Sequence, residues 1–576
     1  MDQQSPESME QILSHHLRSN IDDQPYLPAV EIRKLLDKRT ITRDLRKIRT
    51  RTIDTILKDH VIVLAVLTMV SRQTEIVEFM RHIRDSALPL EGNLKENRIS
   101  TFSLNNGAGR TELRCFDNWA TFVKEGFMTW QWAFNVPHLS LKDGKARDYK
   151  FDNRHVLPWC DAGINEPEET PESSSDSSRQ ANEGAFGEVT PIGIDPQCDG
   201  FGETFKELGL TKRIYALKVL KSRPFTEAAY EREASQLKRF NGKINPHLVT
   251  LLASYTFKGY AHFLFPWADS NLSTFWKTSQ PERNPSFVRW LADQFLGITR
   301  AVLTIHEPDH LKEDSPLYGR HGDIKPDNIL CYTVKGCDYK RLVVADFGLS
   351  SIHHEATRTY VPDTRKPVTP GYRPPESDTI VSNCQISRNY DIWTLGCLFM
   401  EILVWYLGNN EMLLKFQHDR ISQYIVGNLN IFYAIYAKKD HTDGYPADPN
   451  VVIQVKPQVV KYYEKIYEHK DCSRFIRDVC KAIEDHMLLV VAPREKGGEK
   501  RDEEEEKRIM AVDLVKRFEL IKERCEKDSY CLDRLEGVVK PSFKPGVEFT
   551  LTEEACDVIT RYKTKLPVYQ PPQESV

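Results

Sequence analysis

The alternation of apolar and polar residues along the chain predicts where its strands and helices lie. Residues 213–220 alternate as a half-buried strand does, and residues 260–272 begin as an apolar strand and end in a polar connector. Residues 227–240 have apolar positions at helical spacing, with Leu237 and Phe240 near their end. Residues 8–95 combine helical apolar spacing with many charges. The pattern predicts several short amphipathic helices near the N-terminus and a strand–helix–strand arrangement further on.

Two features of residues 1–160 concern packing. The apolar run at residues 61–70 is much shorter than the about 20 residues needed to cross a bilayer, so we expect a buried helix there. Aromatic side chains then gather between residues 100 and 160. We interpret them as a packing surface that docks this region onto the following domain, rather than as a ligand site. They are Phe116, Trp119, Phe122, Phe127, Trp130, Trp132, Phe134 and Trp159.

Two polar stretches interrupt the apolar pattern. Residues 165–180 are acidic, rich in serine and nearly free of apolar side chains, so they cannot bury enough surface to offset the entropy of ordering. Residues 494–507 are dominated by glutamate, lysine and arginine. The first stretch is typical of a linker, and the second is typical of a charged surface insertion.

Composition limits the classes of function. The chain has 576 residues and a net charge of -4, so its overall charge gives no case for nucleic acid or a membrane surface as partner. The N-terminal residues resemble neither a signal peptide nor a transit peptide. The 12 cysteines are scattered without a CxxC pair, which favours reduced thiols in the cytoplasm or nucleus over disulfides or a cysteine metal site.

The strongest chemical signal lies at residues 321–330, followed by Asp346, Phe347 and Gly348. Metal-assisted phosphoryl transfer needs a carboxylate, an ammonium group and hard oxygen ligands in this order. Asp323 is the candidate that accepts or orients the proton of the attacking hydroxyl, and Lys325 is placed to offset charge on the phosphate. Asn328 and Asp346 are the candidate metal ligands.

These motifs and their order resemble a eukaryotic protein kinase domain covering residues of about 175 to 525. The resemblance implies an α+β, two-lobed protein kinase-like fold, here with an additional N-terminal helical and aromatic region. We expect an N-terminal region at residues 1–160, a linker at 161–180, a kinase domain at 181–525 with its N-lobe ending near 265, and a C-terminal extension at 526–576. The kinase resemblance also implies ATP and Mg²⁺ as cofactors.

By the same resemblance, several residues bind the nucleotide. Gly184 and Gly187 stand in the glycine-rich loop over the phosphates, although Asn182 replaces its first glycine. Lys218 is the lysine that grips the α and β phosphates, and Glu233 is its expected counter-charge, with Glu231 as the alternative. The adenine-binding and hinge positions are Val189, Ala216, Phe265 as gatekeeper, Pro266, Trp267 and Ala268.

Residues beyond the catalytic loop complete the resemblance. Glu376, at the end of an activation segment, is expected to pair with Arg508 across the C-lobe. Asp391 is expected to hold the backbone of the catalytic loop. Lys325 and Thr369 are marks of serine/threonine specificity. The expected reaction is therefore transfer of the γ-phosphate of ATP to a protein serine or threonine, with regulatory protein partners possible through residues 1–160.

Gly322 departs from the family pattern, in which arginine usually stands beside the catalytic aspartate. This triplet, together with the hinge sequence, resembles a divergent group of fungal kinase-domain proteins. Because the arginine normally pairs with a phosphate on the activation segment, we expect an activity that does not depend on phosphorylation of that segment.

Two other functions are compatible with parts of this pattern. Small-molecule phosphotransferases of the aminoglycoside and choline kinase type also carry a His-Gly-Asp triplet, but Lys325, Glu376 and Asp391 belong to the protein kinase pattern. A pseudokinase scaffold would bind partners without catalysis. The presence of Lys218, Asp323, Asn328 and Asp346 argues against it.

Overall fold

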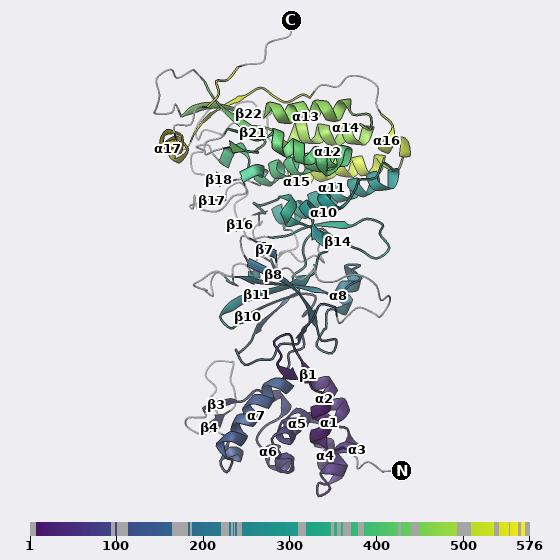
Figure 1. Ribbon diagram of the computed structural model, residues 1–576, viewed down its shortest axis with the longest axis vertical. Coiled ribbons are helices and arrows are strands. Elements are labelled where there is room, and N and C mark those ends of the chain that lie inside the picture. Colours follow the sequence, from purple (N-terminus) through teal and green to yellow (C-terminus); the bar gives the residue numbers. More distant parts are fainter. Residues whose placement is uncertain are drawn as a thin grey trace. The chain divides into compact units, whose positions relative to one another are not determined.

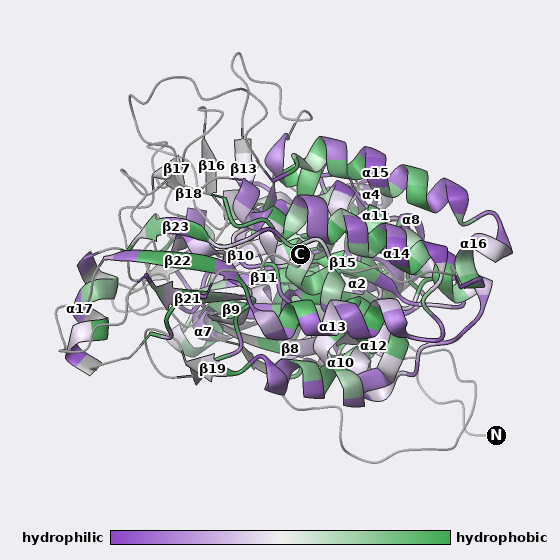
Figure 2. Ribbon diagram, turned by 90° about the horizontal axis from the view of Figure 1, so that it is seen from above, coloured by the Kyte–Doolittle hydropathy of each residue, from purple (hydrophilic) through white to green (hydrophobic). Residues whose placement is uncertain are grey.

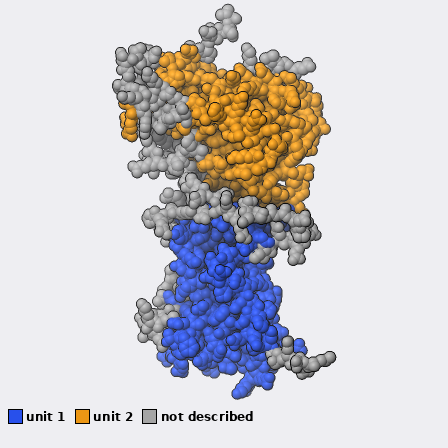
Figure 3. Space-filling model, viewed as in Figure 1, with its two compact units in different colours: residues 1–207, 211–230, 251–267 blue, residues 208–210, 231–250, 268–576 orange. Residues whose placement is uncertain are grey.

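The computed structural model divides into two compact units, shown in Figure 3. Unit 1 comprises residues 1–207, 211–230 and 251–267, and unit 2 comprises residues 208–210, 231–250 and 268–576. The structure describes residues 7–93, 98–100, 113–163, 182–184, 187–220, 230–231, 234–235, 237–238, 245–308, 318–346, 351–353, 359–360, 370–377, 385–386, 388–423, 428–438, 449–491, 508–534, 541–551, 553–562 and 566–570. The predicted linker at 165–180 and the charged insertion at 494–507 lie outside these residues.

The first part of unit 1 is the helical bundle that the sequence predicts (Figure 1). The apolar run forms α5, whose residues from Val61 to Thr68 are all buried, and this confirms the expected buried helix. Helix α1 begins with a capping box between Ser8 and Gln11. The helices of the bundle are α1 (Met9–His15), α2 (Ala29–Leu35), α3 (Lys38–Asp44), α4 (Thr50–Asp59), α5 (Val61–Met69), α6 (Ile76–Phe79) and α7 (Thr121–Phe134), and its short strands are β1 (Arg18–Ser19), β2 (Pro25–Tyr26), β3 (Glu91–Asn93) and β4 (Arg98–Ser100).

The aromatic residues before position 160 have two different roles. Phe116 and Phe127 pack on Phe79 at ring distances of 5.0 and 6.0 Å, so they form the core of the helical bundle. The expectation that this group docks onto the next domain is therefore wrong for them. It is correct for Trp159, whose ring lies 6.1 Å from that of Tyr255.

A seven-stranded sheet forms the rest of unit 1, in the order β5-β10-β11-β9-β8-β6, with β7 also paired to β8. Its two outer strands precede the predicted linker in the sequence: β5 is parallel to β10, and β6 is antiparallel to β8. The predicted strands at 213–220 and 260–266 correspond to β9 and β11. The elements are β5 (Arg147–Lys150), β6 (Trp159–Cys160), β7 (Asn182–Gly184), β8 (Gly187–Ile194), α8 (Gly202–Glu207), β9 (Tyr215–Leu220), β10 (Ala253–Phe257) and β11 (Tyr260–Pro266).

Buried polar contacts join the helical bundle to this sheet within unit 1. Asp195, at the end of β8, is buried and receives hydrogen bonds from the Tyr26 hydroxyl at 2.9 Å and from Arg18 at 2.5 Å. The backbone N–H of Ile21 donates to the carbonyl of Trp159 at 3.0 Å. Because a buried carboxylate needs such partners, these contacts fix the bundle against the sheet.

Part of the predicted helix at 227–240 is described. Residues 230–231, 234–235 and 237–238 are helical, and the buried side chains among them are Tyr230, Ala234 and Leu237. This spacing of four and three residues places the three on one face, as the apolar pattern predicts. The rest of the predicted helix, including Glu233, lies outside the described residues.

Unit 2 is mainly helical and is built around α12 (Asn389–Asp419), which has non-helical backbone angles at Gly408 and Asn409. Among the described residues, α12 is the one helix long and apolar enough to cross a membrane, but 94% of its apolar window is buried, as expected of a core helix. Figure 2 shows hydrophobic and hydrophilic residues alternating along the outer helices α13, α14 and α15. The helices of unit 2 are α10 (Leu272–Thr278), α11 (Pro285–His306), α12, α13 (Pro457–Glu468), α14 (Arg474–Ala482), α15 (Ala511–Arg524), α16 (Asp528–Leu532) and α17 (Glu553–Tyr562).

Short strands complete unit 2. The sheet β21-β22-β23 draws its third strand from the C-terminal extension, and Val568 adds a parallel bridge to Ala437 beside it. The strands are β12 (Ser270–Asn271), β13 (Tyr318–Arg320), β14 (Ile329–Tyr332), β15 (Arg341–Val344), β16 (Ser351–His353), β17 (Thr359–Tyr360), β18 (Gln385–Ile386), β19 (Ser422–Gln423), β20 (Asn428–Leu429), β21 (Tyr433–Ala437), β22 (Asn450–Val455) and β23 (Val547–Thr550).

Candidate active site

The loop between β13 and β14 brings together two of the predicted catalytic residues, Asp323 and Lys325, and one predicted metal ligand, Asn328. The amide nitrogen of Asn328 donates to both the backbone carbonyl and the Oδ2 of Asp323, each at 2.8 Å. The Nζ of Lys325 lies 2.9 Å from the same Oδ2. Asp323 is buried, with 7% of its surface exposed, while Lys325 is partly exposed. The carboxylate is thus held in one orientation beside a cation that can still reach a ligand.

Asp391, in the first turn of α12, holds the backbone of this loop as predicted. Its two carboxylate oxygens accept the N–H groups of His321 and Gly322, each at 2.8 Å. His306 Nε2 lies 2.9 Å from the Oδ2. Burial alone would raise the pKa of Asp391, but the hydrogen bond from His306 and the neighbouring N–H groups hold that pKa below its ordinary value. Asp391 therefore anchors the loop as a carboxylate.

Two residues of the site have left-handed backbone angles. Gly322 has a φ of 84° and Asp346 a φ of 64°. Glycine adopts this conformation without a steric penalty, whereas a residue with a Cβ does so less readily. Asp346 therefore occupies a backbone conformation uncommon for residues other than glycine, as is often seen at functional sites.

The two predicted metal ligands lie on adjoining backbone segments. The N–H of Ala345, which precedes Asp346, donates to the carbonyl of Asn328 at 2.9 Å. The nitrogen of the Asn328 amide is used on Asp323, which leaves a hard oxygen donor on the other side of the same planar group. A carboxylate and an amide oxygen fit a hard divalent cation that also binds phosphate oxygens. Within the described residues no group of three or more His, Cys, Asp or Glu gathers as a metal site.

The predicted nucleotide residues of unit 1 lie on the central strands of the sheet. In β9, Lys218 is paired with Val189 of β8 on one side and with Phe263 of β11 on the other. Ala216 lies opposite Phe265 in the same strand pair. Because directly opposed residues project from the same face, Val189, Ala216, Lys218 and Phe265 share one face of the sheet.

The glycine-rich segment forms the predicted hairpin. β7 and β8 are antiparallel, and Gly184 lies opposite Gly187 at the turn. Small residues at this point let a ligand approach the backbone closely. Residues 185 and 186, between the two strands, lie outside the described residues.

The predicted hinge follows β11. Pro266 has no N–H, and the N–H of Trp267 donates to the carbonyl of Ile214 at 2.9 Å. Of these three consecutive residues, Ala268 therefore has the backbone donor best suited to a nucleotide base. This sharpens the prediction that residues 266–268 all contribute.

The predicted ion pair across unit 2 is confirmed. Arg508 donates to both carboxylate oxygens of Glu376, at 2.5 and 2.9 Å, and its Nε donates to the carbonyl of Leu489 at 2.9 Å. Its guanidinium group also lies 4.9 Å from the Trp393 ring. Of the other predicted site residues, Glu233, Phe347, Gly348 and Thr369 lie outside the described residues, and Glu231 is exposed.

A buried polar network near the end of the activation segment was not predicted. The hydroxyl of Tyr372 donates to Glu401 of α12 at 2.5 Å, and Glu401 is paired with Arg420 at 2.7 Å. The guanidinium carbon of Arg420 lies 4.1 Å from the centre of the Phe416 ring and 4.0 Å from the centre of the Phe432 ring. The Glu401 and Arg420 side chains are at most 1% exposed. The only sequence signal was that a charged residue stands within the long apolar pattern of α12.

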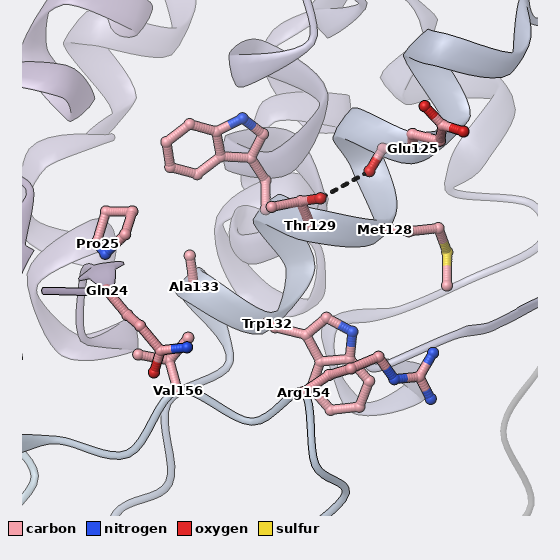
Figure 4. Close-up of a pocket in the computed structure, with 10 residues that line it drawn as sticks. Gln24, Pro25, Glu125, Met128, Thr129, Trp132, Ala133, Arg154 and Val156 are labelled. Carbon is pink, nitrogen blue, oxygen red and sulfur yellow. Dashed lines mark hydrogen bonds between the residues drawn. The ribbon is translucent and has the colours of Figure 1, made fainter. Parts of the chain in front are cut away.

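A hollow of about 490 Å³ lies elsewhere in unit 1 (Figure 4). Its walls come from α7, from the segment at Gln24 and Pro25, and from the segment at Arg154 and Val156. None of the predicted nucleotide or metal residues lines it. The guanidinium group of Arg154 lies 4.8 Å from the ring of Trp132, so a cation–π contact links two of the segments that line the hollow.

Comparisons with known proteins agree with this geometry. The sequence model of the family described as "Protein kinase domain" matches residues 200–486. The serine/threonine-protein kinase ppk15 of Schizosaccharomyces pombe is 28% identical over 209 residues, which is 35% of each chain. The dual specificity protein kinase YAK1 of Saccharomyces cerevisiae is 29% identical over 210 residues, 35% of this chain and 23% of that protein. Human cyclin-dependent kinase-like 4 is 32% identical over 176 residues, 30% of this chain and 38% of that protein.

The fold and the family match place residues 200–486 in the protein kinase class. The chain contains a eukaryotic protein kinase domain, and the predicted α+β kinase fold is confirmed. The domain implies the use of ATP, a protein substrate and, typically, a divalent metal. The matched segments span between about a quarter and two fifths of the relatives described above.

Proposed function

We propose that the protein is an ATP-dependent serine/threonine kinase that uses Mg²⁺ and transfers the γ-phosphate to a protein hydroxyl. The observation that carries the proposal is the catalytic loop. There Asn328 and Lys325 both contact the carboxylate of Asp323, and Asp391 holds the backbone beneath it. Such an arrangement is energetically costly unless its groups pair with one another, since it places one ammonium group and two buried carboxylates close together.

In this proposal each residue of the loop has one task. Asp323 orients the substrate hydroxyl and takes its proton as the oxygen attacks the phosphorus. Lys325 lies beside that oxygen and offsets charge on the transferring phosphate, and its position two residues after Asp323 favours serine or threonine as the acceptor. The polar contacts to Asp323 keep the carboxylate oriented toward the acceptor.

The remaining site residues hold the nucleotide. Asn328 and Asp346 would bind Mg²⁺, which when present neutralises phosphate charge. Lys218 would contact the α and β phosphates and be held by Glu233, while Ala268 would donate to the adenine base. The name of the relative ppk15 supports serine/threonine specificity at 28% identity, whereas YAK1, at 29% identity, is named a dual specificity kinase.

Phosphorylation by the purified full chain tests the proposal. Radiolabelled phosphate transfer from Mg²⁺-ATP to a mixed serine, threonine and tyrosine peptide library is compared for the native chain and for Asp323→Asn. Loss of the catalytic base should lower the rate by about 10²-fold or more. Lys218→Met should give a similar loss of rate, because it removes the proposed contact with the α and β phosphates of ATP. Asp327→Asn is the matched control, because Asp327 is an exposed carboxylate of the same loop.

Two results would contradict the proposal. If the native chain binds ATP but its activity equals that of both active-site variants, the domain is a pseudokinase scaffold. If small alcohols or amines are phosphorylated and peptides are not, the protein is a small-molecule kinase. Labelling confined to tyrosine peptides would overturn the serine/threonine assignment alone.

A further inference from the structure

A row of five paired residues crosses the sheet of unit 1 and ends at the predicted nucleotide face. Asp148 of β5 is paired with Ser254 of β10, which is paired with Phe263 of β11. Phe263 is paired with Lys218 of β9, which is paired with Val189 of β8. Since directly opposed residues share a face, all five side chains project from the face that carries Lys218. One end of this row is contributed by the segment before residue 161.

Tyr230 lies across this row. Its hydroxyl donates to Oδ1 of Asp148, and its ring stacks on that of Phe263 with centroids 5.8 Å apart. Ser254 donates to the same oxygen of Asp148 at 2.9 Å. Tyr230 is 5% exposed, and Ser254 and Phe263 are fully buried. The aromatic stacking and the hydrogen bond together determine where Tyr230 sits on the sheet.

Tyr230 also begins the described part of the helix that continues through residues 231, 234–235 and 237–238. Glu233, the predicted partner of Lys218, follows Tyr230 by three residues in the sequence and lies outside the described residues. A shift of Tyr230 on the sheet would therefore shift the start of the segment that carries this predicted partner. Asp148 limits such a shift, because it accepts the hydrogen bond of the Tyr230 hydroxyl. Asp148 lies outside the residues that match the kinase family.

We propose that Asp148 is a positioning residue for the kinase reaction: it fixes Tyr230, and through it the start of this helix, over the face of the sheet that carries Lys218. Asp148 itself touches neither nucleotide nor substrate. The N-terminal region thereby contributes directly to the geometry of the small lobe, and an exposed carboxylate at the sheet edge sets the position of a buried aromatic residue. The consequence for catalysis rests on the proposed function, whereas the consequence for the helix does not.

The first measurement is independent of catalysis. Amide hydrogen exchange of the peptide covering residues 230–238 is compared in the full native chain, in Asp148→Ala and in Tyr230→Phe. A hydrogen bond to a charged group contributes enough stability that its loss should speed exchange of this peptide by about tenfold. Tyr230→Phe keeps the ring on Phe263 and so tests the hydroxyl alone. Asp148→Asn, which retains an acceptor oxygen, should restore most of the protection.

Tyr149→Phe is the matched control, because it removes a hydroxyl from the next residue of β5, which bonds Ser140 and not Tyr230. Exchange of residues 230–238 should be unchanged in this variant. The double variant Asp148→Ala with Tyr230→Phe should exchange no faster than Asp148→Ala alone, since Asp148→Ala already removes the one interaction that Tyr230→Phe removes. Equal exchange in all variants, or additive effects in the double variant, would overturn the proposal whether or not the protein is a kinase.

The second measurement uses activity. Asp148→Ala and Tyr230→Phe should lower kcat/KM for ATP by about tenfold through a raised KM for ATP, while the KM for the peptide stays unchanged, because the defect lies at the phosphate-binding lysine. A general loss of folded protein would instead lower the active fraction and leave both KM values unchanged. An unchanged kcat/KM for ATP alongside faster exchange would show that the helix position does not control catalysis, and would overturn that half of the proposal.

Discussion

At the scale of single residues, there are two reasons for a glycine at position 322, one regulatory and one conformational. The sequence suggests the loss of an arginine that senses phosphate. The structure adds that the backbone here is left-handed and that its N–H donates to the buried Asp391. Any residue with a Cβ would be strained in this backbone conformation. Glycine therefore avoids backbone strain directly beside the catalytic aspartate.

Replacing this glycine should therefore cost stability. Gly322→Ala is expected to lower the free energy of unfolding by about 1 kcal/mol, because alanine is strained at a φ of 84°. Urea unfolding of the full chain measures the change. Gly163→Ala is the control, since Gly163 has no positive φ and open space around its Cα, and it should be neutral or slightly stabilising. Equal costs for the two variants would refute this account of Gly322.

At the scale of elements, α12 connects two parts of the C-lobe. Asp391 in its first turn holds the catalytic loop. Glu401 in its middle accepts a hydrogen bond from the hydroxyl of Tyr372. The segment that precedes α13 supports the same network, because Lys456 Nζ donates to the carbonyls of Arg420 and Leu429 at 2.7 and 3.0 Å. Because residues 390–407 of α12 are all buried, this part of the helix can transmit a change of position between the catalytic loop and the end of the activation segment.

Lys456 should make stability depend on pH. Burial, with Arg420 nearby, lowers its pKa from 10.5 to about 7. Between these values the unfolded chain binds more protons than the folded chain, so stability rises with pH through this window, by at most about 1.4 kcal/mol per pH unit. Below pH 7 both states are protonated and the dependence ends.

Urea unfolding at pH 6.5, 7.5 and 8.5 tests this expectation against Lys456→Met, which removes the titrating group. The difference in unfolding free energy between the native chain and this variant should grow in favour of the native chain as pH rises. Lys461→Met, at an exposed position of α13, should leave the native pH dependence unchanged. A difference that stays constant across the three pH values would show that Lys456 does not titrate in this range.

At the scale of the whole molecule, the sequence could predict contacts between residues that lie close together in the chain, but not most contacts between distant residues. The catalytic loop was predictable because its residues lie close together in sequence and their chemistry admits few other uses. Glu376 and Arg508 were predictable from the family pattern. Strand β5 was not, because Arg147 to Lys150 are mostly exposed and polar and carry no apolar alternation. The network of Tyr372, Glu401 and Arg420 was not predictable either, because a charged residue within the apolar pattern of α12 does not indicate its partners.

The two strands that flank the sheet should determine whether the kinase domain is soluble alone. A chain that begins at residue 164 lacks β5 and β6 and exposes the backbone edge of β10 and the end of β8 at Gly193 and Ile194, which favours association between molecules. A chain that begins at residue 136 keeps both strands and loses the helical bundle. We expect size-exclusion chromatography to show more monomer for the second chain, although both lose the contacts of Asp195. Equal monomer fractions would mean that the flanking strands do not protect the sheet.

The position of β5 also has a consequence for the order of synthesis. The ribosome produces the chain from its N-terminus, so β6 meets its partner β8 soon after both emerge. Strand β5 is complete at Lys150, but β10, to which it pairs, begins only at Ala253. Until then residues 147–150 have no partner in the sheet, and the row from Asp148 to Lys218 cannot exist. The pair of β5 and β10 then joins β9 only through β11, which ends at Pro266, so a nascent chain that stops before residue 266 cannot present the lysine face in its final form.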